Sequence, residues 1–203
     1  MYKNFKIELS QTEEQSLIPL LNAENSLWCF SENDVAFKAF ELPFFKNYLF
    51  LEAWMLRSIP PVSLSYLWNK SDDIISLNGT KEGIFDNLQK LGIVLNRQTA
   101  IQYVRFVLGC IWTEHGSLRL TEDDEEIEFS SKPTLSEQQF LQKHIRPAKL
   151  TQTESGYSID AVIIYGDSVF QSKIELKNNG IFEIESETLL CEKYRCLRPI
   201  FLE

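Results

Sequence analysis

The sequence predicts an α+β fold, with a mixed N-terminal part that contains two central helices and a C-terminal antiparallel β-meander packed against a helix. Two observations lead to this prediction. Residues 157–186 alternate apolar and polar side chains around two turn sequences, Gly166-Asp167 and the Lys-Asn-Asn-Gly of residues 177–180, which is typical of consecutive hairpins. Residues 98–112 carry apolar side chains nearly all round a helical projection, as expected of a central helix.

The two turns set the register of the meander. Gly166-Asp167 suits a two-residue type II′ loop, and residues 177–180 suit a type I turn closed by a glycine bulge. Counting outward from each turn predicts independently which side chains share a face, and the two counts agree. The shared apolar face comprises Tyr157, Ile159, Ala161, Ile163, Phe170, Ile174, Leu176, Phe182 and Ile184, with Ile159 opposite Ile174 and Leu176 opposite Phe182.

The other face of the meander is predicted to be charged along much of its length. The register places Lys173 between Asp160 and Glu185, and it places Glu175 opposite Glu183. Exposed ion pairs are common and weak. These charges therefore indicate a solvated face, and a functional use of the two opposed glutamates is the minor alternative.

An apolar patch is predicted on this outer face near the tip of the first hairpin. It consists of Val162, Ile164 and Val169. Two interpretations stay open: the patch packs against the N-terminal region, which we favour because small groups of surface hydrophobics are common, or it binds a partner.

The N-terminal part is predicted to begin with a short helix. Ser10 and Glu13 have the spacing of a capping box, and Pro19 is expected to end or kink the helix that follows. Residues 48–56 form an apolar run that suits either a strand or a helix. The other segments that favour strands are residues 27–40, as a hairpin, and residues 63–68 and 74–77.

Helices are predicted next. One follows Thr80 and ends at Gly92, the second spans residues 98–112, and a third runs from about Ser136 to His144. A strand is expected at residues 117–120. Either the second or the third helix could cover the apolar face of the meander. The polar residues 130–134 suggest a boundary between an N-terminal region, 1–129, and a C-terminal region, 130–203, that share one core.

Composition limits the classes of function. The chain has 203 residues, 44% of them hydrophobic, and a net charge of −9, which predicts a globular protein without a nucleic-acid or anionic-membrane surface. No segment approaches the ~20 apolar residues of a membrane span, and the first residues lack the apolar core of a signal peptide. We therefore expect a soluble, cytoplasmic protein that acts without nucleic acid and without a membrane.

The sequence predicts neither a metal nor a cofactor. Of its four cysteines, only Cys191 and Cys196 are close in sequence, and one such pair is a weak zinc signal. Phosphate-binding glycine loops, dinucleotide fingerprints and nucleophile elbows are missing from the sequence.

Three residues are weak candidates for catalysis. Glu114 and His115 adjoin the end of the central helix, where the helix dipole favours a protonated histidine; a helix-terminating histidine is the favoured alternative. Arg105 interrupts the apolar surface of the same helix, where burial demands a carboxylate partner or an anionic ligand. A structural ion pair, or extension to solvent, is the favoured interpretation of Arg105.

Residues 77–80, 103–106 and 164–170, with the sequences Leu-Asn-Gly-Thr, Tyr-Val-Arg-Phe and Ile-Tyr-Gly-Asp-Ser-Val-Phe, resemble an uncharacterised family of small bacterial proteins. The resemblance covers about the last two-thirds of the chain. It implies a bacterial cytosolic protein, and it supplies no activity and no functional residues.

The leading hypothesis is a non-enzymatic binding or adaptor protein that engages a protein partner, or a second copy of itself, through the apolar sheet surface at Val162, Ile164 and Val169. One alternative is a small-molecule enzyme that uses Arg105 with Glu114 and His115. The ten residues between Arg105 and His115 correspond to about 15 Å along a helix, which counts against a shared site. A third hypothesis is an acidic, chaperone-like dimer.

Overall fold

The chain divides into two compact units, and each combines segments that are separate in sequence. In this computed structural model, residues 5–25, 27, 29–60, 62–114, 116–123 and 133–192 are described. The first unit comprises Met1–Asn78 and Asp86–Val94, and the second comprises Gly79–Phe85 and Leu95–Glu203. The predicted boundary at residue 130 falls outside the described residues and stays a prediction. Among the described helices, none is both long enough and apolar enough to cross a membrane.

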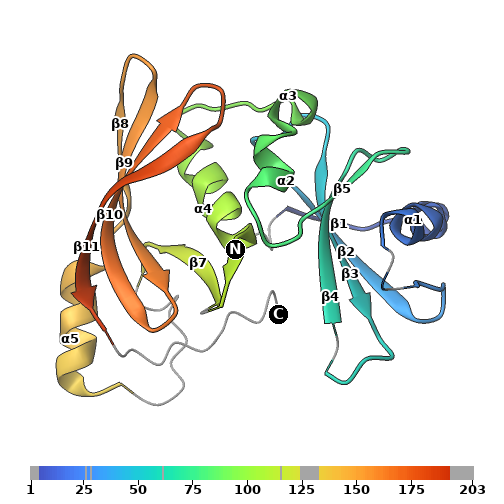
Figure 1. Ribbon diagram of the computed structural model, residues 1–203, viewed down its shortest axis with the longest axis horizontal. Coiled ribbons are helices and arrows are strands. Elements are labelled where there is room, and N and C mark those ends of the chain that lie inside the picture. Colours follow the sequence, from blue (N-terminus) through green and yellow to red (C-terminus); the bar gives the residue numbers. More distant parts are fainter. Residues whose placement is uncertain are drawn as a thin grey trace. The chain divides into compact units, whose positions relative to one another are not determined.

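The first unit is built on a five-stranded antiparallel sheet with the strands in sequence order (Figure 1). The helix α1, Gln11–Glu24, covers one face of this sheet, where the fully buried Leu17 and Leu21 share a core with Leu51 and Tyr66. The α+β prediction is therefore confirmed. The strands are β1 Lys6–Ile7, β2 Val35–Glu41, β3 Leu49–Met55, β4 Val62–Trp68 and β5 Ile74–Ser76.

Helix α1 begins as predicted and continues past Pro19. Ser10 and Glu13 form the expected capping box. Pro19 lies inside the helix, which continues to Glu24, so of the two predicted effects of Pro19, ending the helix does not occur. Leu17 and Leu21 are both fully buried, and this packing on either side of Pro19 compensates for the backbone hydrogen bond that proline cannot donate.

The hairpin predicted for residues 27–40 is also wrong. Among the described residues of this segment, β2 is the one strand that forms, and it pairs with β3. The Asn22 side chain accepts a hydrogen bond from the Phe30 amide at 2.6 Å and donates one to the Phe30 carbonyl at 3.0 Å. These two bonds hold Phe30 beside α1 and occupy the backbone groups that a hairpin would need.

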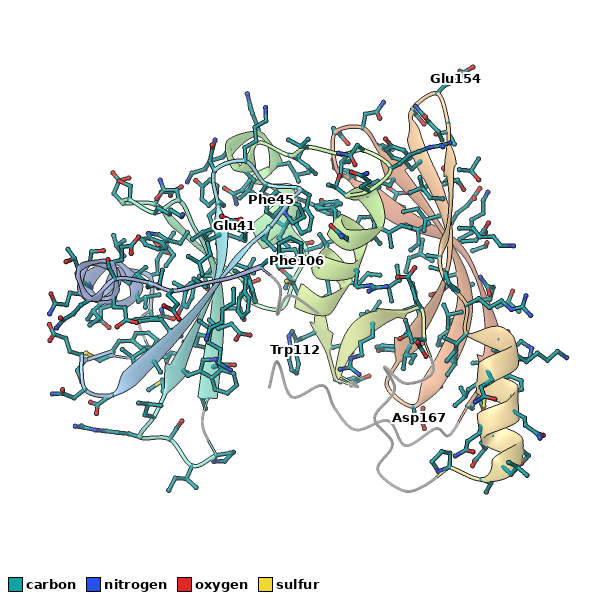
Figure 2. All side chains as sticks on the ribbon, turned by 180° about the vertical axis from the view of Figure 1, so that it is seen from behind. Glu41, Phe45, Phe106, Trp112, Glu154 and Asp167 are labelled. Atoms are coloured by element: carbon teal, nitrogen blue, oxygen red, sulfur yellow. The ribbon has the colours of Figure 1, made fainter. Side chains whose placement is uncertain are left out.

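The second unit contains a six-stranded sheet with the order β11-β10-β9-β7-β6, and β8 also pairs with β9. The long strand β9 has two neighbours on one edge: β8 pairs with its first half and β7 with its second. Figure 2 shows Glu154 and Asp167 in turns at opposite ends of this sheet. The strands are β6 Trp112–Thr113, β7 Gly116–Thr121, β8 Lys149–Gln152, β9 Gly156–Tyr165, β10 Ser168–Lys177 and β11 Phe182–Cys191.

The register predicted for the meander is confirmed for its apolar face. Ile159 lies opposite Ile174, and Leu176 lies opposite both Tyr157 and Phe182. The turns have the expected positive φ at their glycines, 59° at Gly166 and 93° at Gly180.

One predicted pair of the charged face is wrong. A bulge between Lys173 and Ile174 places Lys173 opposite Ser186 and not opposite Glu185. The two charges still meet, because a bulge leaves two residues opposite one, and Lys173 Nζ lies 2.5 Å from Glu185 Oε2.

Two helices cover the two faces of this sheet (Figure 1). Helix α4, Ala100–Cys110, covers the inner face, where the Tyr103 hydroxyl donates to the Gly180 carbonyl at 2.7 Å and the Tyr103 ring packs edge-on against Phe182. Helix α5, Leu135–His144, covers the outer patch. Of the two helices that could cover the apolar face, α4 therefore does so.

The single helix predicted before Gly92 is two short helices in different units. Helix α2, Glu82–Phe85, belongs to the second unit, where the Phe85 ring packs edge-on against Phe182 with centroids 5.5 Å apart. Helix α3, Leu88–Leu91, belongs to the first unit. The predicted C-cap is confirmed, because Gly92 adopts the left-handed conformation at φ 64°.

Candidate functional sites

The charge of Arg105 is compensated within the second unit. Its guanidinium, on α4, forms an ion pair with Glu122, just after β7. The other Glu122 oxygen accepts a hydrogen bond from the Ala148 amide at 2.8 Å. Because Glu122 joins α4 to the segment that leads into β8, the arrangement has the form of a structural ion pair.

The other two catalytic candidates are not brought into a described site with Arg105. Glu114 lies in the turn between β6 and β7. His115 lies outside the described residues. The hypothesis that Arg105, Glu114 and His115 converge on a substrate therefore stays a prediction, because the described residues do not give the positions of all three side chains.

The apolar patch is buried beneath α5. The exposed fractions of Val162, Ile164 and Val169 are 2%, 4% and 0%, and these side chains pack with Leu141 and Ile145. The sequence placed the three residues correctly on the outer face. The prediction that the N-terminal region covers them is wrong, because α5 does so. The sequence did not indicate α5 as the cover, because the helix is separated from β9 in sequence and few of its residues are apolar.

The free edge of β11 is the longest unpaired strand edge in the described part of the second unit. Strand β11 has ten residues and, among the described residues, pairs with β10 alone. Glu183, Glu185 and Glu187 are all exposed along it. On the neighbouring strand, Lys173 pairs with Glu185 and with Glu175, and the hydrogen bond that Lys173 donates to Glu185 is the main reason that the pKa of Lys173 is raised.

The backbone of β11 presents hydrogen-bonding groups at this edge. The Lys177 amide donates to the Ile181 carbonyl at 2.9 Å. Inter-strand bonds alternate along an antiparallel strand. The amides of Phe182 and Ile184 are therefore directed away from β10, on the side of β11 where an added strand would pair.

A second candidate site surrounds Glu52 in the first unit. Glu52 lies in the middle of β3 with Lys38 and Ser65 as its cross-strand neighbours. Its exposed fraction is 0%. Trp54 Nε1 donates to Glu52 Oε2 at 3.2 Å, and Lys38 Nζ lies 4.7 Å from the centroid of the Trp54 ring.

The carboxylate of Glu52 is only partly satisfied. In the described part of the chain, Glu52 Oε1 has no hydrogen-bond partner. Burial raises the pKa of Glu52 more than the Trp54 bond and the nearby Lys38 charge lower it. Glu52 was not among the residues predicted from the sequence, although a glutamate inside the apolar run of residues 49–54 was a visible signal.

The cysteines that the structure describes are free thiols. Cys29 is exposed, Cys191 is half-buried and Cys110 is buried in α4, where burial raises the pKa of its thiol. Cys196 lies outside the described residues. Within the described ranges, His, Cys, Asp and Glu side chains do not gather in a group that could hold a metal ion.

Comparisons with known proteins do not assign the chain to a class. No protein-family profile matches the sequence, and neither a curated protein nor a solved structure matches it. The interpretation of function therefore depends on the sites themselves.

Proposed function

We propose that the protein is a binding module that accepts an extended, basic segment of a partner protein as an added strand on β11. The observation that carries this proposal is the ten-residue edge strand with outward-directed amides at Phe182 and Ile184. In binding by strand addition, backbone hydrogen bonds supply affinity and alternate side chains supply selectivity. The outer apolar patch is covered by α5, so the edge is the more accessible surface of this sheet.

Charge supports a basic partner. Glu183, Glu185 and Glu187 are exposed along β11, and the whole chain carries a net charge of −9. A second copy of β11 paired with the first would bring the glutamates of both copies together, and like charges opposite one another destabilise a sheet. A heterologous basic segment is therefore favoured over a homo-oligomer or a chaperone-like dimer.

The same glutamates have a simpler possible role, because charged residues on an edge strand prevent unwanted pairing between sheets. The two roles predict different binding of a basic peptide to β11. If the charges only protect the edge, a lysine-rich peptide associates weakly, and its affinity does not depend on whether its backbone groups are free to pair. If β11 is a docking edge, binding requires both the charge and free backbone groups on the peptide.

The test is a titration of the full chain with a fluorescent peptide of alternating lysine and valine. We expect saturable binding that weakens at high salt. A peptide of the same composition with proline at alternate positions should bind at least about tenfold more weakly, because proline has no amide to donate. Equal affinity for the two peptides would contradict strand addition.

Substitutions at Ile184 on β11 distinguish the contribution of the backbone amide to peptide binding from that of the side chain. Ile184→Pro removes an amide that faces away from β10, and we expect it to weaken peptide binding by about tenfold or more. Ile184→Ala is the matched control, since it removes the same side chain and keeps the amide. Equal effects of the two substitutions would assign the loss to packing and overturn the proposed edge.

Reversing a charge on β11 distinguishes an effect on peptide binding from an effect on protein stability. Glu183→Lys places a lysine opposite Glu175, so it should raise the urea midpoint of the protein while it weakens binding of the basic peptide severalfold. A variant that is more stable and binds worse cannot owe its lost binding to misfolding. Unchanged affinity would count against a basic partner.

A further inference from the structure

We infer that Glu52, Trp54 and Lys38 form a binding site for a small organic cation, an alkylammonium or guanidinium group. The ligand cation takes the place of the Lys38 ammonium over the Trp54 ring and donates a hydrogen bond to Glu52 Oε1. This site lies in the first unit and is independent of the function proposed for β11.

The unpartnered oxygen of Glu52 is the first support. Glu52 has an exposed fraction of 0%, and Oε1 has no hydrogen-bond partner in the described part of the chain. A buried carboxylate oxygen without a donor is costly, and such groups are normally paired. A ligand that carries an N–H donor would supply the missing bond.

The position of Lys38 is the second support. Its ammonium lies 4.7 Å from the Trp54 ring centroid, which is within the distance at which a cation is attracted to the ring face. The same tryptophan donates to Glu52 at 3.2 Å. An aromatic face next to a carboxylate is the arrangement that recognises organic cations, and Lys38 occupies it as an internal cation.

Lys38 reaches this position from the neighbouring strand. It is half-buried on β2, directly opposite Glu52, and its ammonium sits on a flexible four-carbon stem. An incoming cation replaces the Lys38 charge without changing the net charge beside Glu52. The stem then moves toward solvent.

A metal ion fits this cluster less well than an organic cation. Calcium takes six to eight oxygen ligands, whereas the three named side chains provide a single carboxylate. Ser65 adds at most one hydroxyl on the neighbouring strand. The indole ring is a surface for an organic cation and not a ligand for a metal.

The experiment uses methylguanidinium as the probe and the full chain labelled with ¹⁵N. The indole N–H signal of Trp54, assigned by its loss in Trp54→Phe, is followed during titration at about pH 8, above the ordinary range of a glutamate. We expect a saturable shift in the wild-type protein, with a dissociation constant in the millimolar range. Absence of a shift in both wild-type protein and Lys38→Met overturns the inference.

Lys38→Met should strengthen binding by about tenfold, because it removes the internal competitor and keeps an apolar stem. Lys173→Met is the matched control, since it removes one positive charge in the other unit and should leave the affinity unchanged. The indole signal of Trp112, which is 45% exposed, reports non-specific association and should not follow the same curve.

Glu52→Gln, alone and combined with Lys38→Met, tests the carboxylate. It keeps the shape of the side chain, and we expect it to abolish the saturable shift. If the double variant binds methylguanidinium as tightly as Lys38→Met, the carboxylate plays no part and the proposed site is wrong.

Discussion

Two carboxylates in the first unit respond to their surroundings in opposite ways. Asp73 accepts hydrogen bonds from the Tyr48 hydroxyl and, at 2.6 Å, from Lys90 Nζ. Burial acts to raise the pKa of Asp73, but the bonds from Lys90 and Tyr48 outweigh it and the pKa is lowered. At Glu52, burial is opposed only by the Trp54 bond and the Lys38 charge, and the pKa is raised.

The lowered pKa of Asp73 predicts a loss of stability in acid. Asp73 stabilises the folded state fully above its unfolded pKa of about 3.9, and this contribution is lost as pH falls through the lower folded pKa. Asp73→Asn should therefore reduce the free energy of unfolding at neutral pH by about 1–2 kcal/mol. Urea titrations over a range of pH check this, with the exposed neighbour Asp72→Asn as the control. A deficit that persists in strong acid would show that charge is not its cause.

The raised pKa of Glu52 predicts the opposite dependence. A carboxyl group with a raised folded pKa favours the folded state below its unfolded pKa of about 4.3, and that contribution is lost as pH rises through the folded pKa. Glu52→Gln should therefore raise the urea midpoint at neutral pH, and the gain should shrink toward pH about 4. A lower midpoint at neutral pH would indicate that the ionised carboxylate stabilises the fold.

At the scale of elements, α5 buries one residue fully against the sheet. Leu141 is the only residue of this helix that is fully buried, and it packs on the outer patch at Val162 and Val169. Leu141→Ala should cost about 2–5 kcal/mol and should speed amide hydrogen exchange throughout α5. Leu135→Ala, on the same helix but 71% exposed, is the control and should change neither. Unchanged exchange in Leu141→Ala would show that other contacts hold the helix.

The sequence correctly predicted the features that depend on residues close together in the chain, such as turns and the register of the strands that they join. The turns at Gly166 and Gly180 set the register of the meander correctly, because loop length and glycine conformation fix the pairing of the adjoining strands. The bulge at Lys173 could not be predicted in this way, because counting residues outward from a turn assumes that no extra residue is inserted in either strand. The continuation of α1 through Pro19 could not be predicted either, since it depends on the tertiary packing of Leu17 and Leu21.

The candidate sites were harder to predict from the sequence than the strands, because each site depends on residues that are distant in the chain. The sequence placed Val162 on the outer face, and its burial depends on a helix that is distant in sequence. For Arg105, an ion pair was favoured from the sequence, but its partner Glu122 lies beyond both β6 and β7, and no periodic pattern connects the two. Glu52 was missed because burial of a carboxylate depends on all its cross-strand neighbours.

At the scale of the whole molecule, the chain passes between its two units three times: after Asn78, after Phe85 and after Val94. Neither a composition change nor a glycine-rich linker marks these positions. Instead, α2 and α3 lie two residues apart in sequence and belong to different units. Each unit is therefore completed by a segment whose two ends continue into the other unit.

This connectivity predicts that the stabilities of the two units are coupled through the covalent chain. Phe182 packs against Phe85 of α2, so Phe182→Ala should destabilise the second unit by about 3–5 kcal/mol and release α2. Release of α2 frees the chain that enters Asp86–Val94, which belongs to the first unit. Hydrogen exchange should consequently quicken in α3 as well as in β10 and β11. Leu141→Ala, which destabilises the second unit away from α2, should leave α3 protected, and equal protection of α3 in both variants would show that the crossing segments do not couple the units.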